Sequence, residues 1–205
     1  MYTPKHFQEN DLKTAHDVIA AYPFAIVCVS HDGGLEVAHI PVILDRDAGD
    51  YGQLHFHTAK QNPIWNAFDG TQEAVVIFSG PHAYISADWY EGKNLVPTWN
   101  YVAVHATGSP SVISEDHNAA HIDALAAQEE AHLAPKPPWT SDKVDPDFHK
   151  RMMGGIVGLT MPIAKLEAKA KLSQNHPGKH KAGVIEGLRK RGGDMDNAIA
   201  SLMES

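Results

Sequence analysis

The stretch from Phe24 to Leu44, FAIVCVSHDGGLEVAHIPVIL, decides the fold class. Residues 24–30 form an apolar run rich in β-branched side chains, which favours a strand. Residues 31–34 are a turn cluster, and residues 35–44 are a second apolar run. The pattern therefore predicts two antiparallel strands joined by a tight turn. Pro41 lies inside the second run and has no backbone N–H, which indicates a sheet edge or a bulge there.

Short strands and helices follow one another on both sides of this hairpin. Further extended segments are predicted at residues 53–57, 74–79, 83–86, 97–112 and 155–166. The segment at 74–79 is expected to end at Gly80-Pro81, and the segment at 155–166 is expected to be the last strand. Helices are predicted from Asp11 to Pro23, after Asn62-Pro63, from Glu115 to His132 behind Ser114, from Asp145-Pro146, and in two pieces split by Gly192-Gly193. Consecutive short strands flanked by helices predict an α+β fold, an antiparallel barrel with helices around it.

The composition is that of a globular protein. The chain has 205 residues, 43% of them apolar, which predicts one domain with a real core and excludes a disordered chain. No apolar run reaches the roughly 18 residues needed to cross a bilayer, and the first residues lack the apolar stretch of a signal peptide. Cys28 has no second cysteine to pair with, which fits a reducing compartment. We therefore expect a cytoplasmic protein without membrane contact.

The net charge of −8 makes the whole molecule repel polyanions, so binding to DNA would need a local basic surface. One segment qualifies. Between Lys165 and Arg191 there are eight Lys and Arg residues, opposed only by Glu167 and Glu186. Two interpretations stay open: a pair of solvated helix faces, or a surface that meets DNA.

A first candidate site lies where the strand at residues 53–57 passes into a helix. Thr58 and Lys60 stand in the connecting loop, and Asn62 caps the helix that begins at Pro63. Free N–H groups at a helix start, a hydroxyl and a lysine together favour a phosphate group. The alternative is an ordinary strand-to-helix turn.

A second candidate lies at residues 95–101. Trp99 and Tyr101 alternate along an expected strand and so share one face. They would stack near a flat ring system, with hydrogen bonds from Thr98 or Asn100, or they are core or dimer-interface residues.

A third candidate is the loop at residues 171–177. Lys171, Ser173, Gln174 and Asn175 bring a cation, a hydroxyl and amides into one loop before a helix. They would reach a ligand held by another part of the protein, or Ser173 and Asn175 only cap the helix.

Histidines do not indicate a metal site. His55 and His57 would face the same side of a strand, and His39 or His82 could join them. A tetrahedral zinc site usually uses thiolates, or histidines with a carboxylate, and Cys28 offers no support. We expect no native metal, and the sequence holds no nucleophile elbow, P-loop or dinucleotide fingerprint.

Taken together, the sequence resembles the PaiB family of FMN-binding negative transcriptional regulators nearly from end to end. The segments that carry the resemblance are MYTPKHF at residues 1–7, AHIP at 38–41, HTAKQNP at 57–63, FSGPHAYIS at 78–86, VPTWNY at 96–101 and KLSQN at 171–175. The resemblance implies a split β-barrel of the kind shared with pyridoxamine phosphate oxidases, spanning residues 1–170, with a helical extension at 171–205 packed on it as one structural unit. It also implies a homodimer with each FMN at the subunit boundary.

On this resemblance, the cofactor-binding residues divide by role. Thr58, Lys60 and the helix start at Asn62 would hold the phosphate, with Ala59 between them. The segment His39, Ile40 and Pro41 and the His57 backbone would run along the flavin. Trp99 and Tyr101, or Gln174 and Asn175 of a second copy, would flank the ring, and Lys171 would lie near N1.

Two functions follow as hypotheses. The first is a flavin-dependent regulator of degradative-enzyme and sporulation genes, with the basic segment as the surface for DNA. The second is an FMN-dependent oxidoreductase that uses a reduced nicotinamide, in which His57, His82 or Tyr101 donates a proton. Flavin bleached by a reduced nicotinamide and reoxidised by a substrate would favour the second, and salt-sensitive retention of DNA the first.

Overall fold

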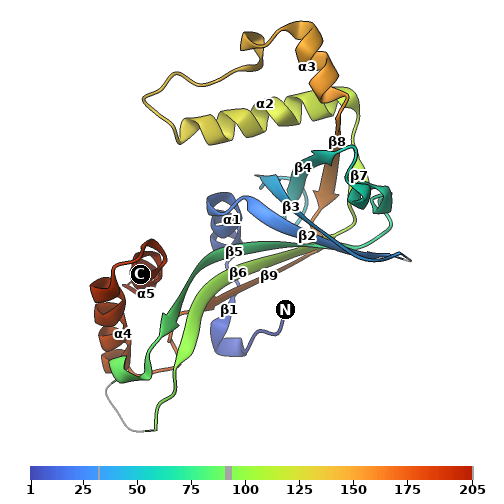
Figure 1. Cartoon of the computed structure of the whole chain (residues 1–205). Helices are drawn as coiled ribbons and strands as arrows, with labels where there is room; N and C mark the ends of the chain where they lie inside the picture. The colour runs from blue at the N-terminus through green and yellow to red at the C-terminus, as the bar shows by residue number, and fades with distance from the viewer. Residues whose placement is uncertain (32, 91–93, 205) are drawn as a thin grey trace. The chain divides into compact units, whose positions relative to one another are not determined.

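A computed structural model describes residues 1–31, 33–90 and 94–204 (Figure 1). The chain forms two compact units, which are described separately. The first unit contains residues 1–22, 78–105 and 167–205, and the second contains residues 23–77 and 106–166. No helix of the described residues is long and apolar enough to span a membrane. The division at residue 170 stays a prediction.

The second unit is built on an antiparallel sheet. Its strands are β2 (Phe24–His31), β3 (Gly34–Asp45), β4 (Gln53–Ala59), β7 (Ser111–Val112), β8 (Ile156–Pro162) and the start of β5 (Ala74–Ile85). Their order is β5-β2-β3-β4-β8-β7. The predicted hairpin is confirmed, with Cys28 opposite Val37 in the β2–β3 pair. Residue 32 of the predicted turn lies outside the described residues.

Pro41 does not mark a sheet edge, and that prediction is wrong. β3 lies between β2 and β4, so both of its sides are paired. Pro41 stands opposite Phe24 of β2, whereas Val42, the next residue, already stands opposite Phe56 of β4. The missing N–H of Pro41 thus falls where β3 passes from one partner to the other, so it interrupts the ladder least there.

The core of the second unit follows the two-residue alternation of its strands. Val27, Leu54, Phe56 and Leu159 are all fully buried. Gly108, at the end of β6 (Thr98–Gly108), must be glycine: a Cβ there would lie 2.2 Å from the carbonyl oxygen of Pro162. This close approach lets the end of β6 meet the end of β8.

Three helices of the second unit begin where the sequence predicts: α2 (Glu115–Ala131), α3 (Pro146–Met153) and the 3-10 helix η2 (Pro63–Ala67). A fourth, the short 3-10 helix η4 (Ser141–Lys143), was not predicted. Ser114 caps α2 and Asp145 caps α3 through their side chains. Figure 1 shows α2 lying across β4 and β8.

The first unit combines strands and helices from three parts of the chain. It contains the 3-10 helix η1 (Lys5–Phe7), β1 (Gln8–Glu9), α1 (Leu12–Ala21), the 3-10 helix η3 (Ala87–Trp89), β9 (Lys165–Lys171), α4 (Gly178–Arg191), α5 (Asp194–Glu204) and most of β5 and β6. The strand order is β1-β9-β6-β5. The predicted start of α1 is confirmed: Asp11 caps the helix, since its carboxylate accepts from the Thr14 N–H at 2.9 Å.

Two strand predictions are wrong. β5 does not end at Gly80-Pro81 but continues to Ile85. Its pairing with β2 covers residues 74–77 only, so the missing N–H of Pro81 removes no bond to β2. Residues 155–166 are not the last strand either, because β9 follows at Lys165–Lys171. In β9 the lysines alternate with apolar residues, and their charge hid the strand pattern.

Helices α4 and α5 form a hairpin on the strand β5 and the helix η3. The residues of their shared buried cluster are Ala83, Ile85, Tyr90, Val184, Leu188, Ile199, Ala200 and Met203. Gly192 separates the helices with φ 75°, a conformation that glycine adopts without a Cβ clash, which confirms the predicted split. The Arg191 guanidinium lies 5.2 Å from the Trp89 ring and donates to the Asp196 carboxylate, so it joins η3, α4 and α5.

Candidate functional site

Three of the predicted flavin residues share one face of the second unit's sheet. His39 and Pro41 lie two residues apart on β3. His57 lies on the neighbouring β4, two residues after His55, which is paired with Ile43 of β3. Residues two apart on a strand point to the same face, so all three side chains share it. His39 is exposed and stacks on Phe24 with ring centroids 6.2 Å apart. This face therefore offers imidazole and proline rings to a flat ligand.

Ile40 and Thr58 belong to the opposite face of the same strands. Both side chains are buried, as the alternation along β3 and β4 requires. Ile40 can meet a ligand on the ring face only through its backbone. Thr58 lies one residue from the end of β4, and Ala59, the last residue, is exposed.

The turn after β4 uses several of its own donors. The Lys60 N–H donates to Gly155 O at 2.8 Å, and the Ile64 N–H donates to the Asn62 side chain at 3.1 Å. The predicted cap is thus confirmed, but the helix behind it is a 3-10 helix of five residues, too short for a strong dipole. The Lys60 side chain is exposed, and its ammonium has no bonded partner among the described residues. Lys60 is therefore the group of this turn best suited to an anion.

A pair of imidazoles adjoins the ring face. His57 Nδ1 lies 3.2 Å from His121 Nε2, with His121 supplied by α2. Burial, followed by the nearby His57 and His55, lowers the pKa of His121 to about 4. Burial also lowers the pKa of His57. Both rings are accordingly neutral near pH 7.

No motif in the sequence singles out His121. Counting from the Ser114 cap would have placed His117 and His121 one turn apart on one side of α2. No sequence pattern showed that this side meets β4, because α2 has no clear apolar face.

Acid is expected to destabilise the second unit through His121. An unfolded histidine has a pKa near 6.5, so between about pH 6.5 and about pH 4 the unfolded chain binds a proton that the folded chain does not. The free energy of unfolding should therefore fall as the pH drops through this window, as urea titrations at several pH values would measure. His121→Gln, which cannot titrate, should flatten the slope; an equal slope in both proteins would contradict the assignment.

In the first unit a cavity of about 430 Å³ gathers the third predicted group. Lys171, Thr98 and Asn175 line it, together with His6 and His176. Lys171 donates to the Thr98 hydroxyl, and its ammonium lies 5.8 Å from the Phe7 ring. The cavity thus holds a cation, a hydroxyl and an amide.

Gln174 and Asn100 are used within the first unit. The Gln174 side chain accepts from Leu172 N and donates to Ala170 O, both at 2.6 Å, and so closes the end of β9. Asn100 is fully buried and donates to Ser173 Oγ at 3.0 Å. Neither amide side chain takes these hydrogen bonds from the Lys171 ammonium.

Trp99 and Tyr101 lie on one face of β6, as predicted, but with different neighbours. Trp99 is 53% exposed and contacts Tyr84 and His82 of β5, with ring centroids 5.9 and 6.2 Å apart. Tyr101 lies over the buried Lys169 ammonium, 5.1 Å from its ring centroid. The Trp99 side is an exposed aromatic patch, whereas Tyr101 stabilises a buried cation.

The structure thus brings the predicted residues together in two sets. One set is the ring face and the Lys60 turn in the second unit, and the other is the cavity and the aromatic patch in the first. Among residues 1–31, 33–90 and 94–204, no three or more His, Cys, Asp or Glu side chains are grouped to hold a metal ion.

Sequence comparisons place the chain in a family. Residues 1–165 match the family model described as "Putative FMN-binding domain". The chain is 32% identical over 204 residues to protease synthase and sporulation protein PAI 2 of Bacillus subtilis, which covers 100% of this chain and 97% of that protein. It is 29% identical over 139 residues to the uncharacterized yeast protein YKL070W, covering 57% of this chain and 81% of that one.

Solved structures share the fold at low sequence identity. The FAD and heme binding protein of Mycobacterium smegmatis matches with a TM-score of 0.60 and 16% identity, covering 91% of this chain and 80% of that chain. The flavocytochrome Anf3 of Azotobacter vinelandii matches with 0.55 and 16%, covering 82% and 72%. The predicted α+β split-barrel fold is confirmed.

The residues present fit a flavin nucleotide. FMN needs a cation near its phosphate, an apolar face for its ring and polar groups at the ring edge. In the second unit, the uncommitted Lys60 ammonium and the His39 and Pro41 face beside His57 supply the first two kinds of group. In the first unit, the Lys171 cavity offers polar groups of the third kind. The chain belongs to the PaiB-type family of FMN-binding domains, and FMN is its cofactor.

Proposed function

We propose that this protein is an FMN-binding transcriptional regulator that works as a homodimer, with each flavin at the subunit boundary. The observation that carries the proposal is the ring face of His39, Pro41 and His57 next to the uncommitted Lys60, in a chain related over its full length to PAI 2. That relative's name ties it to protease synthesis and sporulation. Negative control of degradative-enzyme and sporulation-type genes is the corresponding role here.

Each part of the site has its own task in this proposal. Lys60 and Thr58 hold the phosphate, and the ring face carries one side of the isoalloxazine. Lys171, Gln174 and Asn175, contributed by the second copy, lie at the polar edge of the ring. Bound FMN supplies reversible one- and two-electron redox chemistry, and the chain's part is to orient it and to exclude water.

Exposed aromatic rings support the homodimer. Tyr84 is 40% exposed and Trp99 53% exposed, and the two rings meet edge to face on neighbouring strands. Subunit interfaces are enriched in such side chains. Sedimentation of the wild type and of Trp99→Glu tests this surface, and a wild-type monomer would remove the dimer from the proposal.

FMN is expected to stabilise the protein, and Lys60→Ala to weaken its binding. At about one hundred times its dissociation constant, FMN should add about 2.7 kcal/mol to the free energy of unfolding. Removing Lys60 takes away a charged hydrogen bond worth about 1.5–3 kcal/mol, so affinity should fall at least about tenfold. Flavin fluorescence titration measures both proteins.

Lys13→Ala is the matched control, because Lys13 is an exposed lysine paired with Asp17 on α1. It should bind FMN as the wild type does. Equal affinity of Lys60→Ala and Lys13→Ala would contradict the phosphate assignment.

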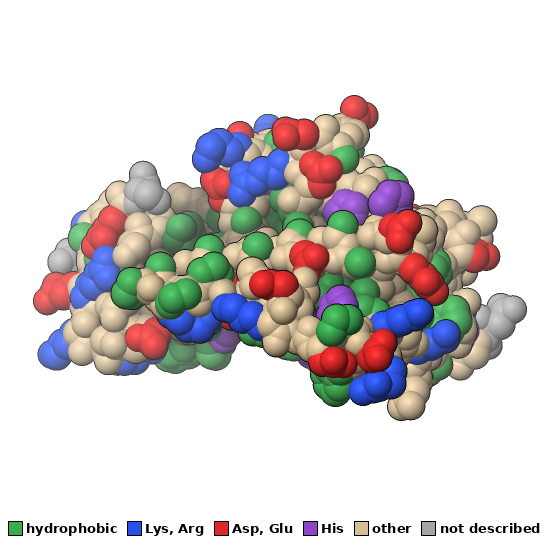
Figure 2. Space-filling model, turned by 90° about the horizontal axis from the view of Figure 1, so that it is seen from above, with side chains coloured by type: hydrophobic (Ala, Val, Ile, Leu, Met, Phe, Trp, Pro, Cys, Tyr) green, Lys and Arg blue, Asp and Glu red, His purple; other side chains and the backbone are tan. Residues whose placement is uncertain are grey.

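The basic segment offers fewer free cations to DNA than its composition indicates. Arg189 donates to Ser201 at 3.0 Å and to Glu204 at 2.7 Å, and Arg191 is bound to Asp196. On the face seen in Figure 2, blue and red side chains are interspersed rather than gathered by sign. The lysines of α4 left to contact DNA are then the exposed Lys179 and Lys190 and the half-buried Lys181.

Replacing these three lysines by alanine is expected to reduce promoter retention and its salt dependence. Each lysine that neutralises a DNA phosphate contributes about 0.9 to the slope of log affinity against log salt, so its removal should flatten the slope by that amount. Gel retention with and without FMN measures this. No retention by the wild type at low salt would contradict direct binding to DNA.

An FMN-dependent oxidoreductase remains the alternative. The feature that favours an oxidoreductase is the pair of imidazoles, His57 and His121, beside the ring face. The lowered pKa of His57, however, makes this side chain a poor proton donor near pH 7. Bleaching of bound flavin by NADH or NADPH, followed by reoxidation with an organic substrate, would establish turnover and displace the regulator.

A further inference from the structure

A cavity of about 480 Å³ lies under α2 in the second unit. Ile43 of β3 and Thr160 of β8 form part of its floor, His55 and Gln53 of β4 form another part, and Ile113 lies at its edge. From α2 it is lined by His117, Ala120, His121 and Ala124. None of the lining side chains is Asp, Glu, Lys or Arg, so the cavity is apolar with a few neutral hydrogen-bonding groups.

Helix α2 leaves this space open because of how it is seated. Asn118 rests on Gly158 of β8, where a Cβ would lie only 2.4 Å from Asn118 Oδ1. That contact fixes the distance of the helix from the sheet. The small side chains of Ala120 and Ala124 then fail to fill the gap toward Ile43, so a hollow of ligand size remains.

His121 brings an unpaired polar atom to this cavity. The side chain is 6% exposed, and its Nε2 faces His57 at 3.2 Å. Its Nδ1 has no hydrogen-bond partner among the described residues. If Nε2 accepts from His57, Nδ1 carries an unpaired hydrogen; if Nε2 donates, Nδ1 is an unpaired acceptor. A buried polar atom without a partner is uncommon and costs free energy.

We propose that this cavity binds a small uncharged aromatic molecule through a hydrogen bond to His121 Nδ1. The apolar walls of Ile43, Ile113, Ala120 and Ala124 would cover the faces of one or two rings. A charged ligand is excluded because no Lys, Arg, Asp or Glu lines the cavity to balance it. None of the predicted flavin residues lines the cavity, and its connection to them is the contact between His121 and His57.

Benzamide is a suitable probe, since it is uncharged, has one ring and can both donate and accept. It would be titrated into the FMN-saturated protein, so that the flavin site is already filled. The readout is the ¹⁵N resonance of His121 Nδ1, which reports directly on a new hydrogen bond in the unaltered protein. Benzamide should shift this resonance saturably, and toluene, which lacks a polar atom, should shift it less.

Ala124→Phe fills the cavity from an exposed position of α2, and Ala127→Phe places the same side chain on this helix outside the cavity. Benzamide affinity should fall about tenfold or more in Ala124→Phe, a loss as large as that of one hydrogen bond. It should stay unchanged in Ala127→Phe. An unshifted Nδ1 resonance, or equal affinity of both variants, would overturn the proposal.

Discussion

Replacing Gly187 by alanine is expected to destabilise the first unit, although alanine is normally better in a helix than glycine by about 1 kcal/mol. A Cβ at Gly187 of α4 would lie 2.4 Å from Cδ2 of Trp89. One turn earlier, a Cβ at Gly183 would lie 2.2 Å from the Trp89 carbonyl oxygen, so the helix cannot slide to make room. Overpacking of this kind costs about 1–3 kcal/mol, which outweighs the gain in propensity. Urea unfolding measures the net loss.

Gly178→Ala is the matched control, since Gly178 lies in the same helix and has nothing within 4 Å of its Cβ position. It should be neutral or slightly stabilising. If Gly187→Ala raised stability as much as Gly178→Ala, the seating of Trp89 on α4 would be wrong.

Phe56→Ala is expected to cost more, about 3–5 kcal/mol, the range for removing a buried aromatic ring. Phe56 on β4 is fully buried and meets the ring of Phe68 edge to face, with centroids 6.3 Å apart. The Phe56 ring packs on the buried face of β4, opposite the face that carries His57, so collapse around the gap should shift β4 and also weaken FMN binding. Urea unfolding and flavin titration of one preparation measure both effects.

Phe148→Ala serves as its control, because Phe148 of α3 is 47% exposed. A surface truncation should change the free energy of unfolding by less than about 0.5 kcal/mol. Similar losses for the two variants would contradict the position of the core.

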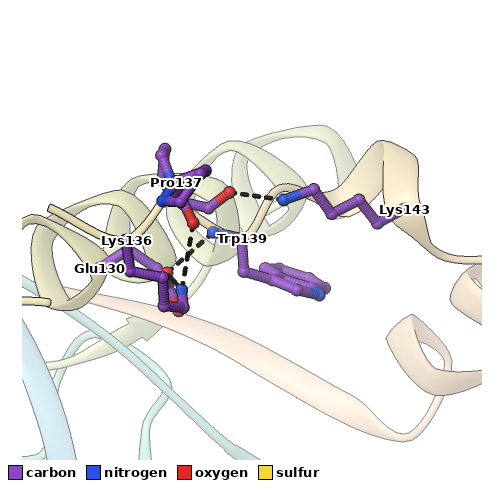
Figure 3. A network of polar contacts seen from close by, with 6 residues as sticks. Glu130, Lys136, Pro137, Trp139 and Lys143 are labelled. Carbon is purple, nitrogen blue, oxygen red and sulfur yellow. Dashed lines mark hydrogen bonds and ion pairs between the residues drawn. The ribbon is translucent and has the colours of Figure 1, made fainter. Parts of the chain in front are cut away.

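The segment between α2 and α3 has a structure that the sequence pattern does not predict. A network of polar contacts orders the proline-rich segment around Trp139, and no sequence pattern predicts this network. In Figure 3 the Glu130 carboxylate meets the side chain of Lys136 and the backbone of Trp139. The Trp139 N–H donates to this carboxylate at 2.8 Å, and Lys143 donates to Pro138 O at 2.6 Å. Such contacts join residues that are 5 to 9 positions apart without a periodic pattern.

Elsewhere the sequence predicted what local chemistry controls. Apolar alternation and turn residues located β2, β3 and β4, and side-chain caps located α1, α2 and α3. Which strands pair with each other does not depend on local sequence. Nothing in residues 24–45 shows that β3 pairs with β2 up to Pro41 and with β4 from Val42 onward. The same holds for the site. Lys60 and His57 were predicted, whereas His121 was missed because its role depends on α2 meeting β4.

We propose that Thr58 and Lys60 hold the FMN phosphate beside the ring face of His39, Pro41 and His57. A crystal structure of the complex with FMN tests it most directly. We expect a phosphate oxygen within about 3 Å of Lys60 Nζ or Thr58 Oγ1, with the isoalloxazine over the ring face. A phosphate bound in the Lys171 cavity, beyond hydrogen-bond reach of both Thr58 and Lys60, would contradict it.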